Sequence, residues 1–136
     1  MGSFMSRLSF SLAALFVGFS VFAGCQLAAS KTLSLTEADH GRAVRAKKGE
    51  AIQIVLEGNP TPGYTWMVDD VDPKIVAATG APSFEPASTA VGAGGKFTLN
   101  FVALEHGQTN MRVIYIRPSE RGRAPEKTFA IMITVD

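Results

Sequence analysis

The chain has 136 residues, of which 46% are hydrophobic, with 13 Lys and Arg against 12 Asp and Glu and a single cysteine. This length predicts one domain, and the near-balanced charge argues against a nucleic-acid-binding protein, which normally carries a clustered basic face. One cysteine cannot form an intramolecular disulfide, so the domain must be held together by its apolar core.

The first segment, residues 1–24, has the layout of a secretory signal peptide. Arg7 precedes a run of apolar and small residues that only serines interrupt. This order of charge, apolar run and small residues is typical of exported proteins. The run is too short and too rich in serine for a membrane-spanning helix, which needs about 20 predominantly apolar residues. We therefore expect residues 1–24 to be removed on export.

The end of this segment, Phe22-Ala23-Gly24-Cys25, resembles the cleavage box of bacterial lipoproteins, in which the cysteine becomes the first mature residue and carries a lipid. A lone exported thiol needs a reason to be present, and lipidation supplies one. We expect Cys25 to anchor the protein in the cell envelope or periplasm, with residues 25–30 as a short linker. The alternative is an ordinary signal peptide followed by an incidental cysteine.

From residue 31 onward the chain consists of short alternating runs separated by Gly, Pro, Asn and Asp, the pattern of β-strands and turns. Strands are predicted at residues 32–35, 51–57, 64–68, 96–102, 110–116 and 127–135. The alternation is clearest where Phe97, Leu99 and Phe101 share one face. Residues 74–78 can form either a strand or a single helical turn.

Strands of this kind predict an all-β sandwich over residues 31–136, because two antiparallel sheets can each present one apolar face to a shared core. Trp66, the only tryptophan, is expected to fill that core, as a tryptophan does in immunoglobulin-like sandwiches. A β-barrel is the main alternative. The basic residues between positions 42 and 48 are interpreted as a solvated strand edge or turn.

The sequence offers no arrangement suited to catalysis, metal binding or cofactor binding. His40 and His106 each precede a glycine and are interpreted as turn residues. There is no serine elbow and no set of ligands with zinc spacing. The acidic stretch 69–72 lacks the pattern of a calcium loop and is expected to be a solvated turn. The glycine-rich residues 91–95 precede a strand, whereas phosphate-binding loops open a helix. We predict that the chain is not an enzyme.

Three loops between the predicted strands carry the most informative motifs. They are Asn59-Pro60-Thr61-Pro62-Gly63-Tyr64, then Gly92-Ala93-Gly94-Gly95, then Arg117-Pro118. In this order they resemble the signature loops of the chagasin family, whose members inhibit papain-like cysteine proteases and carry Asn-Pro-Thr-Thr-Gly-Tyr/Phe, Gly-x-Gly-Gly and Arg-Pro-Trp/Phe. The resemblance covers nearly all of residues 31–136. It departs from the family at Pro62, where threonine is usual, and at Ser119, where an aromatic residue is usual.

The resemblance implies an immunoglobulin-like fold with the three loops at one end, and reversible inhibition of papain-like, cathepsin L-like proteases by blocking the active-site cleft. Residues 59–64 would lie over the catalytic Cys-His pair, with Thr61 near the thiolate and Tyr64 bracing the loop base. Residues 92–95 would let the backbone approach the enzyme closely. Arg117 would place hydrogen-bond donors at the rim of the cleft.

Two other functions fit the residues. One is a non-inhibitory envelope lipoprotein that uses the sandwich as a protein-interaction module, which the change at Ser119 favours because fold alone does not specify function. The other is a sandwich that binds a small ligand or glycan. That function requires an exposed aromatic platform, and Tyr64 is the single aromatic residue that the three motifs contain.

Overall fold

The computed structural model describes residues 31–136, so the predicted signal peptide (residues 1–24), linker (residues 25–30) and anchor Cys25 lie outside the described residues. The described part forms strands and two short 3-10 helices, and no helix in it is long and apolar enough to cross a bilayer. The elements are β1 (Thr32–Thr36), η1 (Glu37–Asp39), β2 (Ala43–Ala46), β3 (Ala51–Gly58), β4 (Thr65–Asp70), β5 (Val76–Ala78), β6 (Ser83–Pro86), β7 (Gly95–Ala103), β8 (Gly107–Ile116), η2 (Pro118–Glu120) and β9 (Lys127–Val135).

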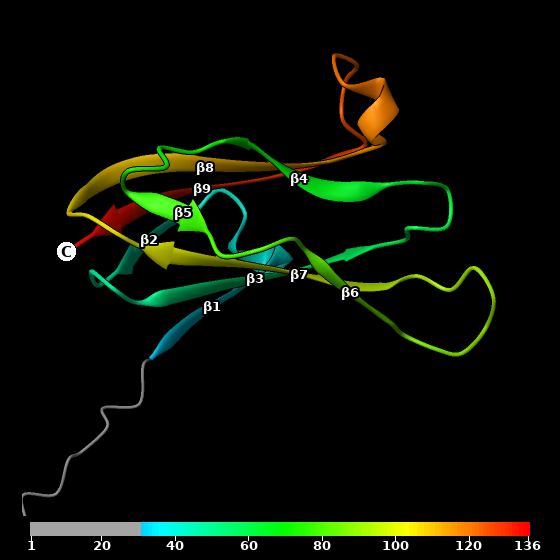
Figure 1. The fold of residues 1–136 in the computed structure, drawn as a ribbon, viewed down its shortest axis with the longest axis horizontal. Coiled ribbons are helices and arrows are strands. Elements are labelled where there is room, and N and C mark those ends of the chain that lie inside the picture. The colour runs from blue at the N-terminus through cyan, green and yellow to red at the C-terminus, as the bar shows by residue number, and fades with distance from the viewer. Residues whose placement is uncertain (1–30) are drawn as a thin grey trace, which may run out of the picture.

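The strands form two facing sheets, which Figure 1 shows edge-on. The 5-stranded sheet has the order β1-β3-β7-β5, with β6 also paired to β7, and the 4-stranded sheet has the order β2-β9-β8-β4. This architecture confirms the predicted immunoglobulin-like β-sandwich. Two edge pairs, β1 with β3 and β2 with β9, are parallel, while the remaining pairs are antiparallel.

The core lies between the sheets and is built from alternate residues of the long strands. The largest fully buried side chains are Trp66, Phe101, Phe129, Ile52, Ile54, Leu56, Met111, Ile133, Val76 and Val113. Trp66 is 2% exposed, as predicted, and its indole N–H donates to the carbonyl oxygen of Glu57 at 3.1 Å. This hydrogen bond removes the cost of burying the indole nitrogen without a partner.

The structure contains two short strands that the sequence pattern did not predict, β2 and β6. Both obtain their extended conformation from a long neighbour, since β2 pairs with β9 and β6 pairs with β7. β2 carries Arg45 at a sheet edge, and Lys47 and Lys48 follow it, which agrees with the interpretation of the basic group. Of the ambiguous residues 74–78, the first two end a turn and the last three form β5.

One local expectation was wrong. The acidic stretch 69–72 is only partly a turn, because Asp69 and Asp70 form the end of β4. An ion pair between Asp69 and Arg112 on the neighbouring strand β8 holds this end of the strand. Asp72 does lie in the turn, where its backbone N–H donates to the Thr109 hydroxyl oxygen at 2.9 Å.

Candidate functional site

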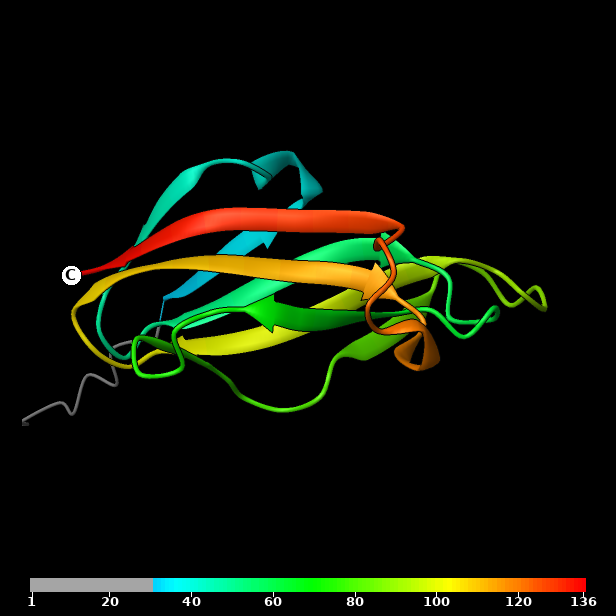
Figure 2. The same cartoon turned by 90° about the horizontal axis from the view of Figure 1, so that it is seen from above.

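The three predicted loops meet at one end of the sandwich. Loop 1 (residues 59–64) joins β3 to β4, loop 2 (residues 87–94) joins β6 to β7, and loop 3 (residues 117–126) joins β8 to β9. Figures 1 and 2 show all three at the end opposite the C-terminus. Strand register explains this placement, because Gly58 at the end of β3 pairs with Gly95 at the start of β7, and the start of β4 pairs with the end of β8.

Loop 1 is closed by its own hydrogen bonds. The Asn59 side-chain oxygen accepts a bond from the Thr61 N–H at 3.0 Å, and the Gly63 N–H donates to the Pro60 carbonyl oxygen at 2.8 Å. Gly63 has a φ of 87°, a left-handed value that glycine adopts without strain. Thr61, Pro62 and Gly63 are exposed, so this ordered turn presents its apex to solvent.

The base of loop 1 rests on Tyr115, a buried residue near the end of β8. The Tyr115 hydroxyl accepts a hydrogen bond from the Asn59 N–H at 2.6 Å and donates one to the Asn59 carbonyl oxygen at 2.8 Å. The Tyr64 ring stacks on the Tyr115 ring with centroids 5.0 Å apart. Sequence reasoning assigned the bracing role to Tyr64 and missed Tyr115. The available signal was an inward-facing tyrosine, whose buried hydroxyl requires a partner.

Loop 2 is tied to loop 1 through the same asparagine. The Asn59 side-chain N–H donates to the Gly92 carbonyl oxygen at 3.0 Å. Gly92 itself has a φ of 78°, which again favours glycine. At Gly95 a Cβ atom would overlap the Glu85 carbonyl oxygen on β6, so this glycine is required for the pairing of β6 with β7.

Loop 3 is tied to loop 1 through Arg117. Its Nε–H donates to the Pro62 carbonyl oxygen at 2.8 Å, and the guanidinium carbon lies 4.7 Å from the centre of the Tyr64 ring. A guanidinium nitrogen also lies 3.5 Å from a carboxylate oxygen of Glu120. The guanidinium of Arg117, which was expected to donate hydrogen bonds to a protease, therefore makes contacts inside the protein. Pro118 and Ser119, which follow in η2, are exposed.

The hydroxyl of Tyr64 keeps its proton at neutral pH. Burial raises the pKa of this group above its ordinary value of 10.0, the Arg117 charge opposes that shift, and the Glu126 carboxylate adds to it. A neutral ring under the Arg117 guanidinium is well suited to a cation–π contact, because the attraction arises from the ring quadrupole. The contact is therefore insensitive to pH in the neutral range.

Val91 is the most exposed large apolar residue of the described chain, and sequence reasoning did not single it out. Its side chain is fully exposed at the tip of loop 2, where no neighbouring residue covers it. Loops 1 and 2 contain no charged residue, whereas loop 3 contains three arginines and two glutamates. The tip formed by loops 1 and 2 is thus neutral, with Thr61, Pro62 and Val91 among its exposed residues.

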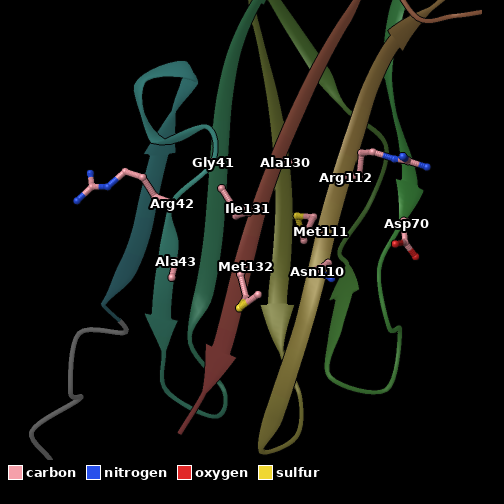
Figure 3. Close-up of a pocket in the computed structure, with 10 residues that line it drawn as sticks. All are labelled: Gly41, Arg42, Ala43, Asp70, Asn110, Met111, Arg112, Ala130, Ile131 and Met132. Carbon is pink, nitrogen blue, oxygen red and sulfur yellow. The ribbon is translucent and has the colours of Figure 1, made fainter.

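A separate hollow of about 480 Å³ lies on the outer face of the 4-stranded sheet, and Figure 3 shows the residues around it. Its lining residues are Gly41, Arg42, Ala43, Asp70, Asn110, Met111, Arg112, Ala130, Ile131 and Met132. None of them is aromatic, so the hollow lacks the platform that a glycan-binding site would need. Across residues 31–136 there is also no group of three or more His, Cys, Asp or Glu side chains that could hold a metal ion.

Comparison with known proteins gives a family, a relative and a shared fold. The model of the family described as "Chagasin family peptidase inhibitor I42" matches residues 45–133. Amoebiasin-1 of Entamoeba histolytica is 32% identical over 108 residues, covering 76% of this chain and 99% of that protein. The cysteine protease inhibitor EhICP2 from Entamoeba histolytica is similar in structure, with a TM-score of 0.67 and 23% identity over 77% of this chain and 96% of that one.

PbICP-C, whose structure was determined in complex with falcipain-2, shares the fold with a TM-score of 0.54 at 17% identity, over 79% of this chain and 91% of that one. The family match spans most of the sandwich, and the three loops follow one another in the order of the family motifs. The chain therefore belongs to the chagasin family of peptidase inhibitors and is a binding protein rather than an enzyme.

Proposed function

We propose that this protein inhibits papain-like, cathepsin L-like cysteine proteases reversibly by inserting loops 1, 2 and 3 into and around the active-site cleft. The observation that carries the proposal is the linkage of the three loops into one unit. Asn59 ties loop 1 to loop 2, and Arg117 ties loop 3 to loop 1. A unit ordered before binding loses little conformational entropy in the complex, which favours affinity.

The shape of loop 1 explains how the cleft could be blocked without cleavage. Pro60 and Pro62 restrict the backbone on either side of Thr61, and the turn is closed between Pro60 and Gly63. A substrate binds as an extended strand across such a cleft, whereas this turn folds back on itself. Thr61 would place a small polar side chain near the catalytic thiolate while the peptide bonds stay out of register. PbICP-C, which shares the fold, was solved in complex with falcipain-2, and this supports the binding of a protease by such a sandwich.

The test is a titration of the purified protein against active papain and a cathepsin L-like enzyme, following hydrolysis of a fluorogenic peptide. We expect stoichiometric, reversible, competitive inhibition. Thr61→Glu and Gly94→Glu should each abolish it, because a charge would be buried in the interface. If both variants inhibit as well as the unchanged protein does, loops 1 and 2 do not enter the cleft. If the folded unchanged protein fails to inhibit either enzyme, the interaction-module function takes its place.

We further propose that the protein is exported and anchored in the cell envelope through a lipid on Cys25. The sequence of residues 1–25 supports this proposal, and so does the placement of the loops. Thr32 at the start of β1 pairs with Ala51 at the start of β3, whereas loop 1 follows the end of β3. An anchor that precedes β1 would therefore hold the end of the sandwich opposite the three loops and leave them free to meet a protease.

Labelled palmitate incorporated in a bacterial host tests the anchor directly. We expect label on the unchanged protein and none on Cys25→Ala, which should be released as a soluble exported protein. Absence of label from the unchanged protein would remove the lipid anchor from the proposal. It would not affect the inhibitory function, which is measured separately.

A further inference from the structure

The charges of the inhibitory end are concentrated in loop 3. Loops 1 and 2 contain no charged residue, and loop 3 has no large apolar or aromatic side chain. An aromatic residue usually stands at the position of Ser119 in this family, and a buried aromatic is a common source of interface energy. Loop 3 must therefore contribute to binding by other means, and its exposed groups are mainly charged.

One of the two acidic groups of loop 3, Glu120, is paired with arginines of the same loop. Glu120 is half-buried and lies between two arginines, with its carboxylate 3.5 Å from Arg117 and 3.7 Å from Arg123. Glu126, the second acid of the loop, is exposed, and its charge helps to raise the pKa of the Tyr64 hydroxyl. With three arginines against these two carboxylates, loop 3 keeps a net positive charge.

The two arginines at the outer turn of loop 3 are exposed, although one of them, Arg123, also lies near Glu120. The side chain of Arg123 is 79% exposed, and Arg121 is also exposed, with one guanidinium nitrogen 3.7 Å from the Met67 sulfur. Between them Gly122 has a φ of 101°, and the Arg123 N–H donates to the Glu120 carbonyl oxygen at 3.1 Å. The turn thus holds two cationic side chains in a defined place beside the neutral tip.

The acid of the sheet nearest this turn is already paired. Asp69 on β4 shares a surface groove with Arg121 and Arg123, but it forms an ion pair with Arg112 of β8. The flank of loop 3 therefore presents a net positive surface at the edge of the unit that enters the cleft.

We propose that Arg121 and Arg123 bind carboxylates on the rim of the target protease, so that the partner is a papain-like enzyme whose cleft is bordered by acidic residues next to loop 3. This inference rests on the proposed inhibitory function. Charges at the rim of an interface act mainly on the rate of association and make it dependent on salt. Loop 3 would then steer the neutral tip toward the cleft, in place of the missing aromatic contact.

The experiment measures association and dissociation rates by stopped flow with a cathepsin L-like enzyme chosen for carboxylates along its cleft. We expect the double variant Arg121→Gln/Arg123→Gln to associate about tenfold more slowly at low ionic strength, with dissociation little changed. The difference should shrink to nearly nothing at an ionic strength of about 0.5 M, where charges are screened within a few ångströms.

A charge-matched control is available at the opposite end of the molecule. Arg45→Gln/Lys47→Gln removes the same charge close to the end of β2, which pairs with the last residues of β9, whereas loop 3 precedes the first residue of β9. The length of β9 separates the two sites by roughly 30 Å, at about 3.3 Å per residue. This variant should associate at the rate of the unchanged protein, within twofold.

The outcomes separate this inference from the function on which it rests. If the unchanged protein does not inhibit the enzyme at all, the proposed function fails before any variant is compared. If the unchanged protein inhibits normally and the two double variants have the same association rate at every ionic strength, the proposal of an acidic rim on the protease is wrong. Faster dissociation of the Arg121→Gln/Arg123→Gln variant, with an unchanged association rate and no dependence on salt, would also overturn the inference. Such a result would indicate that these side chains act through packing rather than through charge.

Discussion

The Nε–H of Arg117 donates to the carbonyl oxygen of Pro62 at 2.8 Å, which joins the loop after β8 to the loop after β3 across 55 residues of sequence. The same guanidinium lies over the Tyr64 ring and next to Glu120. Arg117 thus ties loop 3 to loop 1. We infer that this arginine positions loop 1.

This role predicts that Arg117→Lys will weaken inhibition even though it keeps the charge. A lysine ammonium cannot reproduce the planar fork that donates to Pro62 while stacking on Tyr64. We expect the inhibition constant for papain to rise about tenfold, with a thermal unfolding midpoint close to that of the unchanged protein, because the side chain is 41% exposed. Full inhibition by Arg117→Lys would show that charge alone is needed at this position.

The two hydrogen bonds of Asn59 can be separated by Asn59→Asp. An aspartate keeps the oxygen that accepts from the Thr61 N–H but loses the N–H that donates to Gly92, and it sets a carboxylate against a carbonyl oxygen. We expect loop 2 to lose its link to loop 1 and the inhibition constant to rise by about an order of magnitude. Amide hydrogen exchange should show faster exchange in loop 2 than in loop 1. Equal protection of both loops would mean that the Gly92 bond does not order loop 2.

Tyr115→Phe should destabilise the domain as well as weaken inhibition. It removes the hydroxyl that bonds both the N–H and the carbonyl oxygen of Asn59. Leaving such groups without partners costs about 1–3 kcal/mol, which urea unfolding can measure. Tyr64→Phe is the matched control, because that ring keeps its stacking on Tyr115 and its contact with Arg117. The idea fails if the two variants lose the same stability.

Tyr64 should make a specific contribution to stability at alkaline pH. Burial raises the pKa of its hydroxyl, so the folded protein holds this proton more tightly than the unfolded chain does. The contribution is complete below pH 10.0, the ordinary value, and is lost as the pH rises through the raised pKa of the folded state. We expect the unfolding free energy of Tyr64→Phe to fall less steeply than that of the unchanged protein between pH 10.0 and the raised pKa of the folded state. Parallel slopes for the two proteins would show that Tyr64 is not the group responsible.

Gly94 at the end of loop 2 and Gly95 at the start of β7 should respond differently to alanine. At Gly95 a Cβ would overlap the Glu85 carbonyl oxygen, whereas at Gly94 it would meet the Gly58 carbonyl oxygen at 3.4 Å, close to ordinary contact. Gly95→Ala must therefore displace β6 and should cost about 1–3 kcal/mol in unfolding free energy. Gly94→Ala should cost much less in a parallel urea titration. If Gly95→Ala is as stable as Gly94→Ala, β6 can move away from the added Cβ without a loss of unfolding free energy.

Much of the fold was predictable from the sequence because the long strands alternate strictly. In residues 96–102 and 127–135 every second residue is apolar and lies on the same face of the strand. Burial of that apolar face is the dominant driving force for folding. The three loops were predictable because Asn, Pro and Gly mark turns, and their order made them resemble the motifs of the chagasin family. The short strands β2 and β6 were not predictable, because their conformation comes from a neighbour distant in sequence.

The sequence by itself determined the class of fold, the three loops and their order, since these depend on local alternation and turn chemistry. The tertiary structure alone decided how the loops are held together. Tyr115 beneath Asn59, Arg117 against Pro62, and Asn59 against Gly92 join residues that lie 56, 55 and 33 positions apart. No local pattern encodes such contacts. They exist because the strand register of two packed sheets brings the three loops to the same end, where these polar groups meet.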